Sequence, residues 1–133
     1  MTQVNRLYDT RYFWEIYTTQ DPDRITRLRS LLVERRHRFV SSITLYELYK
    51  LSIANEGKDV AELRCLLAKK DMQVVSVDSG IAEEAARISY QSRIPMANAL
   101  IVATAKISGA ECITADPHFT SVKTRWIQKL SKS

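Results

Sequence analysis

One continuous stretch, from Ile94 to Phe119, constrains the fold of this chain more than any other. It reads IPMANALIVATAKISGAECITADPHF and predicts, in order, a helix, a turn, a short buried strand and a polar loop. Pro95 suits the first helical turn, where its missing N–H costs nothing, and Gly109 is placed to end the helix. The many alanines favour close packing of this helix against a sheet. Asp116 directly follows the strand, and open parallel sheets carry their chemistry just beyond the carboxyl ends of the strands.

The rest of the chain alternates predicted strands with helical segments. Strands are expected at 4–8, 38–40, 72–77 and 111–114, with an edge strand at 124–127. The segment Met72–Val77 is the clearest of these by its β-branched content. This alternation predicts an α/β fold with a short, mainly parallel sheet of about four or five strands, flanked by helices on both faces.

Apolar spacing assigns an inner face to each predicted helix. Asp21 and Asp78 are expected to cap two of these helices, and a third helix is expected from Ser42 to Asn55. The expected inward residues are Ile25, Leu28 and Leu32; Leu45, Leu48, Tyr49 and Ser52; Val60, Leu63 and Leu67; Ile81, Ala85 and Ile88; and Leu100, Ala103, Thr104 and Ile107.

Size and composition favour an ordered protein with one core. The chain has 133 residues, 45% of them apolar, and only three glycines and three prolines, so we expect a single domain over 1–133. It has no apolar run of membrane-spanning length, and its start lacks the apolar segment of a signal peptide. Its two cysteines show no metal spacing, so a reduced, cytoplasmic setting is expected. The net charge of +5 is compatible with a polyanionic partner.

Polar side chains gather where predicted strands end and helices begin. Asp9 and Asp116 each follow a strand, whereas Glu47 and Asn98 lie in the first turns of helices. Strand ends and helix starts converge on one rim of a parallel sheet. Three carboxylates and one amide form an all-oxygen set, which suits Mg²⁺ or Mn²⁺ rather than zinc. A cation would also relieve the repulsion between the carboxylates.

Each of these residues also has a purely structural interpretation. Asp9 can cap the helix that follows it. Thr44 and Glu47 match the T-x-x-E pattern of a capping box. Asp116, before a proline, is an ordinary turn initiator, and Asn98 can cap its own helix or face solvent. Only the joint arrangement of these residues favours the metal site.

Four segments together carry a resemblance to a known family. In chain order they are the strand and DT pair at Leu7–Thr10, SSITLYEL at Ser41–Leu48, IPMANALIVATA at Ile94–Ala105 and TADPHF at Thr114–Phe119. They resemble the successive motifs of the PIN domain, the nuclease fold of VapC-type toxins in bacterial and archaeal toxin–antitoxin pairs. The resemblance covers essentially the full length of the chain and implies a PIN-like fold.

The resemblance also implies metal-dependent hydrolysis of RNA. Asp9, Glu47 and Asp116 keep the acidic identities of the family and are the expected catalytic and metal-binding residues. Asn98 stands where the family usually carries an aspartate, so the fourth ligand has lost its charge. We therefore expect a nuclease that is weakened or inactive, with Mg²⁺ or Mn²⁺ as its cofactor.

Several further polar residues have two possible roles. Thr10 and Thr114 are expected to support the site through their hydroxyls, and Arg11 either binds a substrate phosphate or pairs with a carboxylate. His118 is either a proton donor or an exposed loop histidine. The basic cluster 35–38 either grips RNA phosphates or is simply solvated. The aromatic residues Tyr12, Phe13, Trp14 and Tyr17 either stack on bases or pack in the core.

The resemblance further implies an RNA substrate, a small VapB-type antitoxin as partner, and a homodimer. The main alternative is a degenerate PIN domain that binds RNA or a protein without cutting. Two other α/β families fit poorly. A phosphotransferase of the haloacid-dehalogenase type needs a second aspartate where this chain has Arg11. A receiver domain needs an acidic pair before its phosphorylated aspartate, and none is present there.

Overall fold

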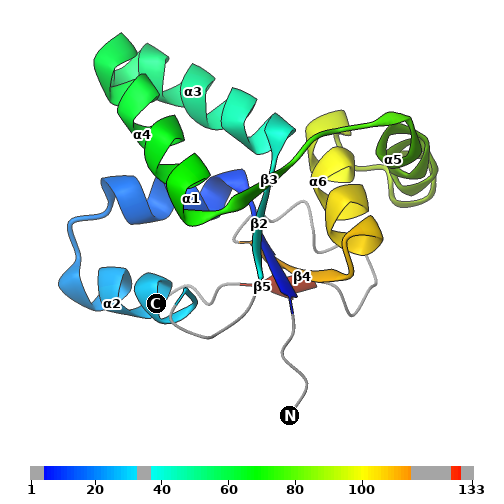
Figure 1. Cartoon of the computed structure of the whole chain (residues 1–133), viewed down its shortest axis with the longest axis horizontal. Helices are drawn as coiled ribbons and strands as arrows, with labels where there is room; N and C mark the ends of the chain where they lie inside the picture. The colour runs from blue at the N-terminus through cyan, green and yellow to red at the C-terminus, as the bar shows by residue number, and fades with distance from the viewer. Residues whose placement is uncertain (1–4, 33–36, 115–126, 130–133) are drawn as a thin grey trace.

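A computed structural model of the chain describes residues 5–32, 37–114 and 127–129 (Figure 1). Its strands form one parallel sheet of order β3-β2-β1-β4-β5, with helices packed on both faces, so the predicted fold class is confirmed. The elements are β1 (Asn5–Tyr8), α1 (Thr10–Thr18), α2 (Pro22–Ser30), β2 (Arg38–Ser41), α3 (Ser42–Glu56), α4 (Lys58–Asp71), β3 (Gln73–Val75), α5 (Ser79–Ser92), α6 (Met96–Ile107), β4 (Ala110–Thr114) and β5 (Ile127–Lys129).

The sheet separates two apolar cores. Helices α1 to α4 lie on one side of it, and α5 and α6 lie on the other (Figure 1). Successive strand residues point to opposite faces. Leu7 and Cys112 therefore pack under α5 and α6, whereas Tyr8 and Ile113 pack under the other helices. The central strands are buried on both faces, as expected for a parallel sheet.

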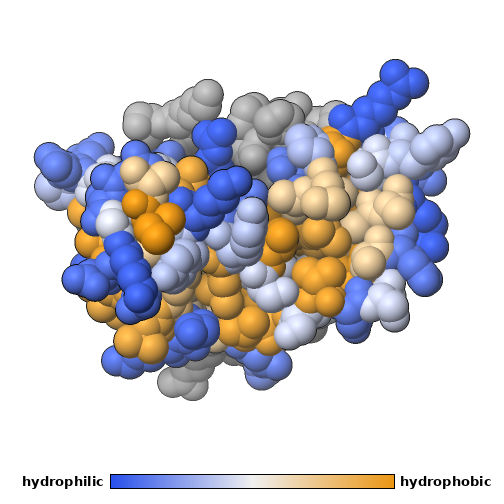
Figure 2. Space-filling view, turned by 90° about the horizontal axis from the view of Figure 1, so that it is seen from above, coloured by the Kyte–Doolittle hydropathy of each residue, from blue (hydrophilic) through white to orange (hydrophobic). Residues whose placement is uncertain are grey.

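The predicted inner face of α4 is wrong. Ala61, Arg64, Cys65 and Ala68 form its buried face, whereas Leu63 and Leu67, predicted to face inward, are exposed. Helix α4 packs closely beside α3 in an antiparallel hairpin, and small side chains permit that approach (Figure 1). The leucines are left outside, and apolar surface is visible both over α3–α4 and over α5–α6 (Figure 2).

Two other predicted elements differ in detail. Strand β3 is shorter than the expected 72–77, because the chain leaves the sheet after Val75 and Asp78 caps α5. Helix α6 is buried on most of its circumference rather than along one stripe, since it lies between the sheet and α5. Ile107, predicted to face inward, is 53% exposed at the end of that helix.

Several local predictions are confirmed. Asp21 and Asp78 accept hydrogen bonds as N-caps, and Gly109, with φ +62°, follows the end of α6. Strand β5 lies at the edge of the sheet, with described bounds that begin at Ile127, so 124–126 fall outside the described residues. None of the helices in the described ranges combines the length and apolar character needed to cross a bilayer.

Candidate functional site

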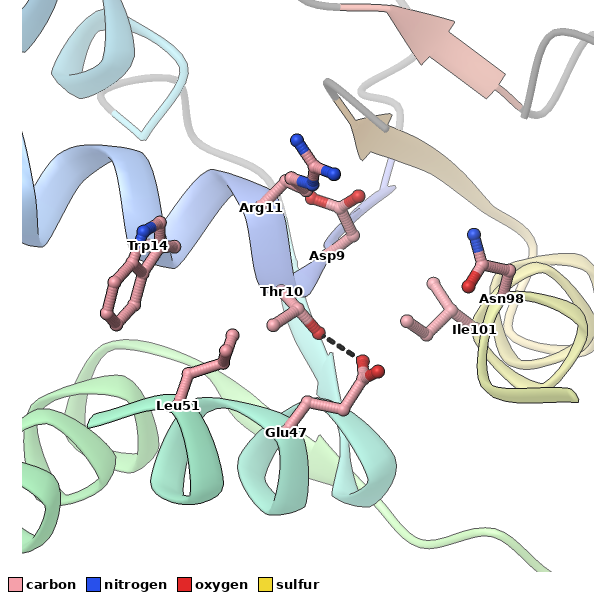
Figure 3. A pocket seen from close by; sticks show the side chains of 8 residues that line it. All are labelled: Asp9, Thr10, Arg11, Trp14, Glu47, Leu51, Asn98 and Ile101. Atoms are coloured by element: carbon pink, nitrogen blue, oxygen red, sulfur yellow. Dashed lines mark hydrogen bonds between the residues drawn. The ribbon is translucent and has the colours of Figure 1, made fainter. Parts of the chain in front are cut away.

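A cavity of about 370 Å³ opens at the carboxyl end of the central strands. Three helices contribute to it, all beginning on the same rim of the sheet (Figure 3). Its lining residues are Asp9, Thr10, Arg11, Trp14, Glu47, Leu51, Asn98 and Ile101. The structure thus brings three of the four predicted site residues into one cavity. Asp116, the fourth, lies outside the described residues.

Asp9 is fixed in place through both carboxylate oxygens. Oδ1 accepts a hydrogen bond of 2.9 Å from the Tyr12 backbone N–H, which makes Asp9 the N-cap of α1. Oδ2 accepts a hydrogen bond from the Thr114 hydroxyl at the end of β4. Asp9 is only 2% exposed, so these donors stabilise a carboxylate with little access to water. The capping and site interpretations of Asp9 are therefore compatible.

Glu47 belongs to the cavity rather than to a capping box. Its Oε1 accepts a hydrogen bond of 2.6 Å from the Thr10 hydroxyl, drawn as the dashed line in Figure 3. Helix α3 is capped instead by Ser41, whose Oγ accepts from the Ile43 N–H at 3.2 Å. The capping-box alternative for Thr44 and Glu47 is wrong, because α3 begins at Ser42, as expected, and is capped by Ser41 at the end of β2. Glu47 thus projects from the second turn of α3 toward α1.

Asn98 enters the cavity from the first turn of α6. Its residue is buried, at 9% exposed, and it lines the cavity opposite Glu47 (Figure 3). Helix α6 begins after Pro95 without a side-chain cap. The capping role considered for Asn98 is therefore not observed.

Of the basic residues considered for RNA binding, Arg11 lies at the cavity and the described members of the 35–38 cluster do not line it. Arg11 is exposed and lines the cavity beside Asp9 (Figure 3). Arg38 donates a hydrogen bond of 2.9 Å to the Leu32 carbonyl, and the His37 ring stacks on Phe39. These two members of the basic cluster thus have structural contacts. The other two, together with His118, lie outside the described residues.

Three apolar residues also line the cavity, namely Trp14, Leu51 and Ile101. Leu51 and Ile101 were not predicted as site residues, whereas Trp14 was expected either to stack on bases or to pack in the core. Helix geometry supplies the missing signal, because residues three or four apart share one face. Trp14 follows Thr10 by one turn on α1, Leu51 follows Glu47 on α3, and Ile101 follows Asn98 on α6. Each polar residue thus has an apolar neighbour one turn further along its own helix.

The donor set of the cavity fits a hard divalent cation. Within the described ranges, no three His, Cys, Asp or Glu residues lie together as a complete metal cluster. However, Mg²⁺ usually takes only one or two carboxylates and keeps several waters. Asp9 and Glu47 supply two carboxylates, Asn98 supplies an amide oxygen, and the cavity has room for water beside them.

Solved structures with the same fold include several toxin–antitoxin proteins. VapBC2 from Rickettsia felis, bound to promoter DNA, is 13% identical with a TM-score of 0.78, and the match covers 95% of this chain and 98% of that chain. Mycobacterium tuberculosis VapC20, described as a sarcin–ricin loop cleaving toxin, is 16% identical with a TM-score of 0.73, covering 93% and 99%. FitAcB from Neisseria gonorrhoeae is 23% identical with a TM-score of 0.71, covering 95% and 96%.

At these identities the likeness establishes a shared fold. No curated protein sequence matches the chain. The sequence model of the PIN domain matches residues 7–124, which include the end of β1, the DT pair that follows it, α3, α6 and β4. The chain therefore belongs to the PIN domain family.

Proposed function

We propose that this protein is a metal-dependent endoribonuclease, the toxin component of a VapBC-type toxin–antitoxin pair. The observation that carries the proposal is the shared cavity of Asp9, Glu47 and Asn98, which come from three separate segments of the chain. Membership of the PIN family and the fold shared with VapC20, a toxin described as cleaving the sarcin–ricin loop, support the same conclusion.

Asp9, Glu47 and the Asn98 amide oxygen would hold the Mg²⁺ or Mn²⁺ ion, and Asp116 is proposed as a further ligand from its place after β4. When bound, such an ion lowers the pKa of a water molecule and neutralises charge on the attacked phosphate. The lining of the cavity supports this assignment, since it presents oxygens from three elements to one space.

The remaining polar residues position the ligands and the substrate. Thr114 and the amide of Tyr12 hold Asp9 in one orientation, and Thr10 does the same for Glu47. Preorganised carboxylates need no rearrangement when a cation binds. Arg11, exposed at the cavity, can bind the RNA phosphate next to the attacked one through its guanidinium.

Asn98 lowers the activity in this proposal. Asparagine offers an oxygen of nearly the same shape as aspartate but without its charge. One negative charge fewer weakens the attraction for a divalent cation, and Arg11 beside the carboxylates reduces the local negative potential further. The chain is therefore expected to be a weak nuclease or an inactive one.

Cleavage of RNA with Mg²⁺ or Mn²⁺ tests this proposal. We expect Asn98→Asp to cut at least about tenfold faster than the unchanged chain, because it restores the missing charge. Glu47→Gln added to Asn98→Asp should abolish the gain. It is a better control than Asp9→Ala, which would also remove the cap of α1.

Two outcomes would contradict the proposal in different ways. Equal cleavage by the unchanged chain and by Asn98→Asp would contradict the role assigned to Asn98. Absence of cleavage of total cellular RNA by every variant, with all of them folded, would favour the alternative of a degenerate PIN domain that binds without cutting.

We further propose a cytoplasmic protein with two protein partners, a small VapB-type antitoxin and a second copy of the chain. Structures of VapBC complexes share this fold, and exposed apolar residues over α3–α4 and α5–α6 support protein contacts. Light scattering should give a dimer, and Tyr90→Glu with Met96→Glu on α5–α6 should shift it toward the monomer. If the double variant stays dimeric, the α5–α6 face is not the contact between the two copies.

A further inference from the structure

The cavity has two chemically different ends. Asp9, Glu47 and Asn98 bring oxygens to one part of it, and Thr10 lies between them and the other part. At that other end, the side chains of Trp14 on α1 and Leu51 on α3 face each other across the space (Figure 3). The apolar end is thus continuous with the site proposed for the attacked phosphate.

A buried arginine, Arg64, packs against one face of the Trp14 indole. The Arg64 guanidinium lies 5.4 Å from the centre of the indole, a cation–π contact on one face of the ring. Arg64 is only 8% exposed and donates to the Ser52 hydroxyl at 3.1 Å and to the Glu56 carboxylate at 2.5 Å. These bonds fix the guanidinium, which in turn limits the orientations open to Trp14.

We propose that the Trp14–Leu51 end of the cavity is a subsite for an unpaired nucleobase of the RNA, which stacks on Trp14; this rests on the proposed nuclease function. The half-buried indole contacts Arg64 on one face, packs against the neighbouring core, and also lines the cavity. Leu51, 41% exposed although apolar, supplies the opposite wall. A flat aromatic base fills a space between a fixed indole and a leucine.

The surroundings favour a nucleobase over an apolar side chain of a protein. Arg11 lines the same cavity, so a base at Trp14 can be accompanied by a phosphate at Arg11. The cavity also joins the base and the carboxylate end within one volume of about 370 Å³, the order of size of small-molecule sites. Stacking accepts any base, so the subsite would require unpaired RNA without reading its sequence.

Tryptophan fluorescence gives a direct test, because the chain has only two tryptophans, Trp14 and Trp126. Trp126→Phe leaves Trp14 as the only reporter, and Glu47→Gln in the same chain prevents cleavage. A single-stranded RNA of mixed sequence, about 12 nucleotides long, is added with Mg²⁺. We expect binding to quench the Trp14 emission, and a matched oligonucleotide of abasic residues to bind without quenching it.

Affinity measured with a labelled form of the same RNA supplies the second readout. Trp14→Ala should weaken binding about tenfold, and Trp14→Phe should recover most of the loss. Neither change should affect binding of the abasic oligonucleotide. Val74→Ala, which trims a side chain 38% exposed on β3 that does not line the cavity, is the control and should have no effect. Thermal unfolding checks that each variant is folded.

The outcomes separate this subsite from the proposed nuclease activity. RNA binding without quenching of Trp14, or equal losses with RNA and abasic oligonucleotide, would overturn the subsite; so would absence of RNA binding. Cleavage by Asn98→Asp that does not depend on Trp14 would overturn the subsite but leave the nuclease. Binding that depends on Trp14, with no cleavage by any variant, would support the subsite and contradict the nuclease.

Discussion

Asp9 serves the fold and the cavity with the same carboxylate. One oxygen accepts a hydrogen bond from the Tyr12 N–H, which has no partner within α1 itself. The other accepts a hydrogen bond from Thr114 on the neighbouring strand β4. The same residue also lines the cavity. Because Asp9 is also the N-cap of α1, the first turn of that helix fixes the position of the proposed metal ligand.

At this scale, Thr114→Val tests the support of Asp9. Valine has the same shape as threonine but lacks the hydroxyl that donates to the buried carboxylate. We expect the free energy of unfolding in urea to fall by about 1–3 kcal/mol. Thr114→Ser keeps the donor and should lose less. Equal stability of the valine variant and the unchanged chain would show that this hydrogen bond contributes nothing to folding.

The helical hairpin of α3 and α4 depends on one residue between the helices. Gly57 has φ +91° and ψ 174°, a backbone region that essentially only glycine adopts. It ends α3 and begins α4 within a single residue, so the two helices fold back on each other. This tight connection places Arg64 of α4 beside Ser52 and Glu56 of α3.

Two glycine substitutions should therefore have opposite effects on stability. Gly57→Ala should lower the free energy of unfolding by about 1–3 kcal/mol because of its backbone conformation. Gly80→Ala, in the first turn of α5, meets only the Asp78 carboxylate at an ordinary 3.5 Å and should raise it by up to about 1 kcal/mol. Urea unfolding of both variants is the measurement. The same sign for both would contradict the role given to Gly57.

Across the whole molecule, burial of titratable groups predicts a loss of stability in alkali. Burial, with the charges of Asp9 and Glu111 nearby, raises the pKa of the Cys112 thiol well above its usual value. Burial also raises the pKa of Tyr17 to about 12. Above about pH 8.5 the thiol ionises in the unfolded chain while it stays protonated in the folded one. Stability is therefore complete below that pH and falls as the pH rises toward the folded-state pKa.

Urea unfolding at about pH 7 and about pH 10 measures this dependence. Cys112→Ala should lower stability at both values, because it leaves a small cavity, but it should flatten the decline between them. Cys65→Ala is the matched control. Burial raises the pKa of that thiol too, but without the charges of Asp9 and Glu111, so this change should flatten the decline less than Cys112→Ala does. An unchanged slope in Cys112→Ala would contradict the assignment.

Local signals in the sequence predicted much of this molecule. The caps at Asp21 and Asp78, the end of a helix at Gly109 and the positions of the strands along the chain all follow from short segments. The inner face of α4 could not be predicted, because it depends on packing against α3 rather than on the spacing of its leucines. Likewise, Glu47 matched a capping pattern, and only the arrangement of α1 beside α3 shows that its partner is Thr10.

The pairing of β1 with β4 has a consequence for protein synthesis. Asp9 leaves the ribosome well before its partner Thr114, which lies 105 residues further along the chain. At ordinary bacterial and eukaryotic rates of elongation, those residues take about 5–20 s to make. Throughout that interval the nascent chain has a carboxylate but no strand to hold it, and Asn98 is also among the later residues. The complete cavity therefore requires β4 to have been made, and translation itself delays its appearance.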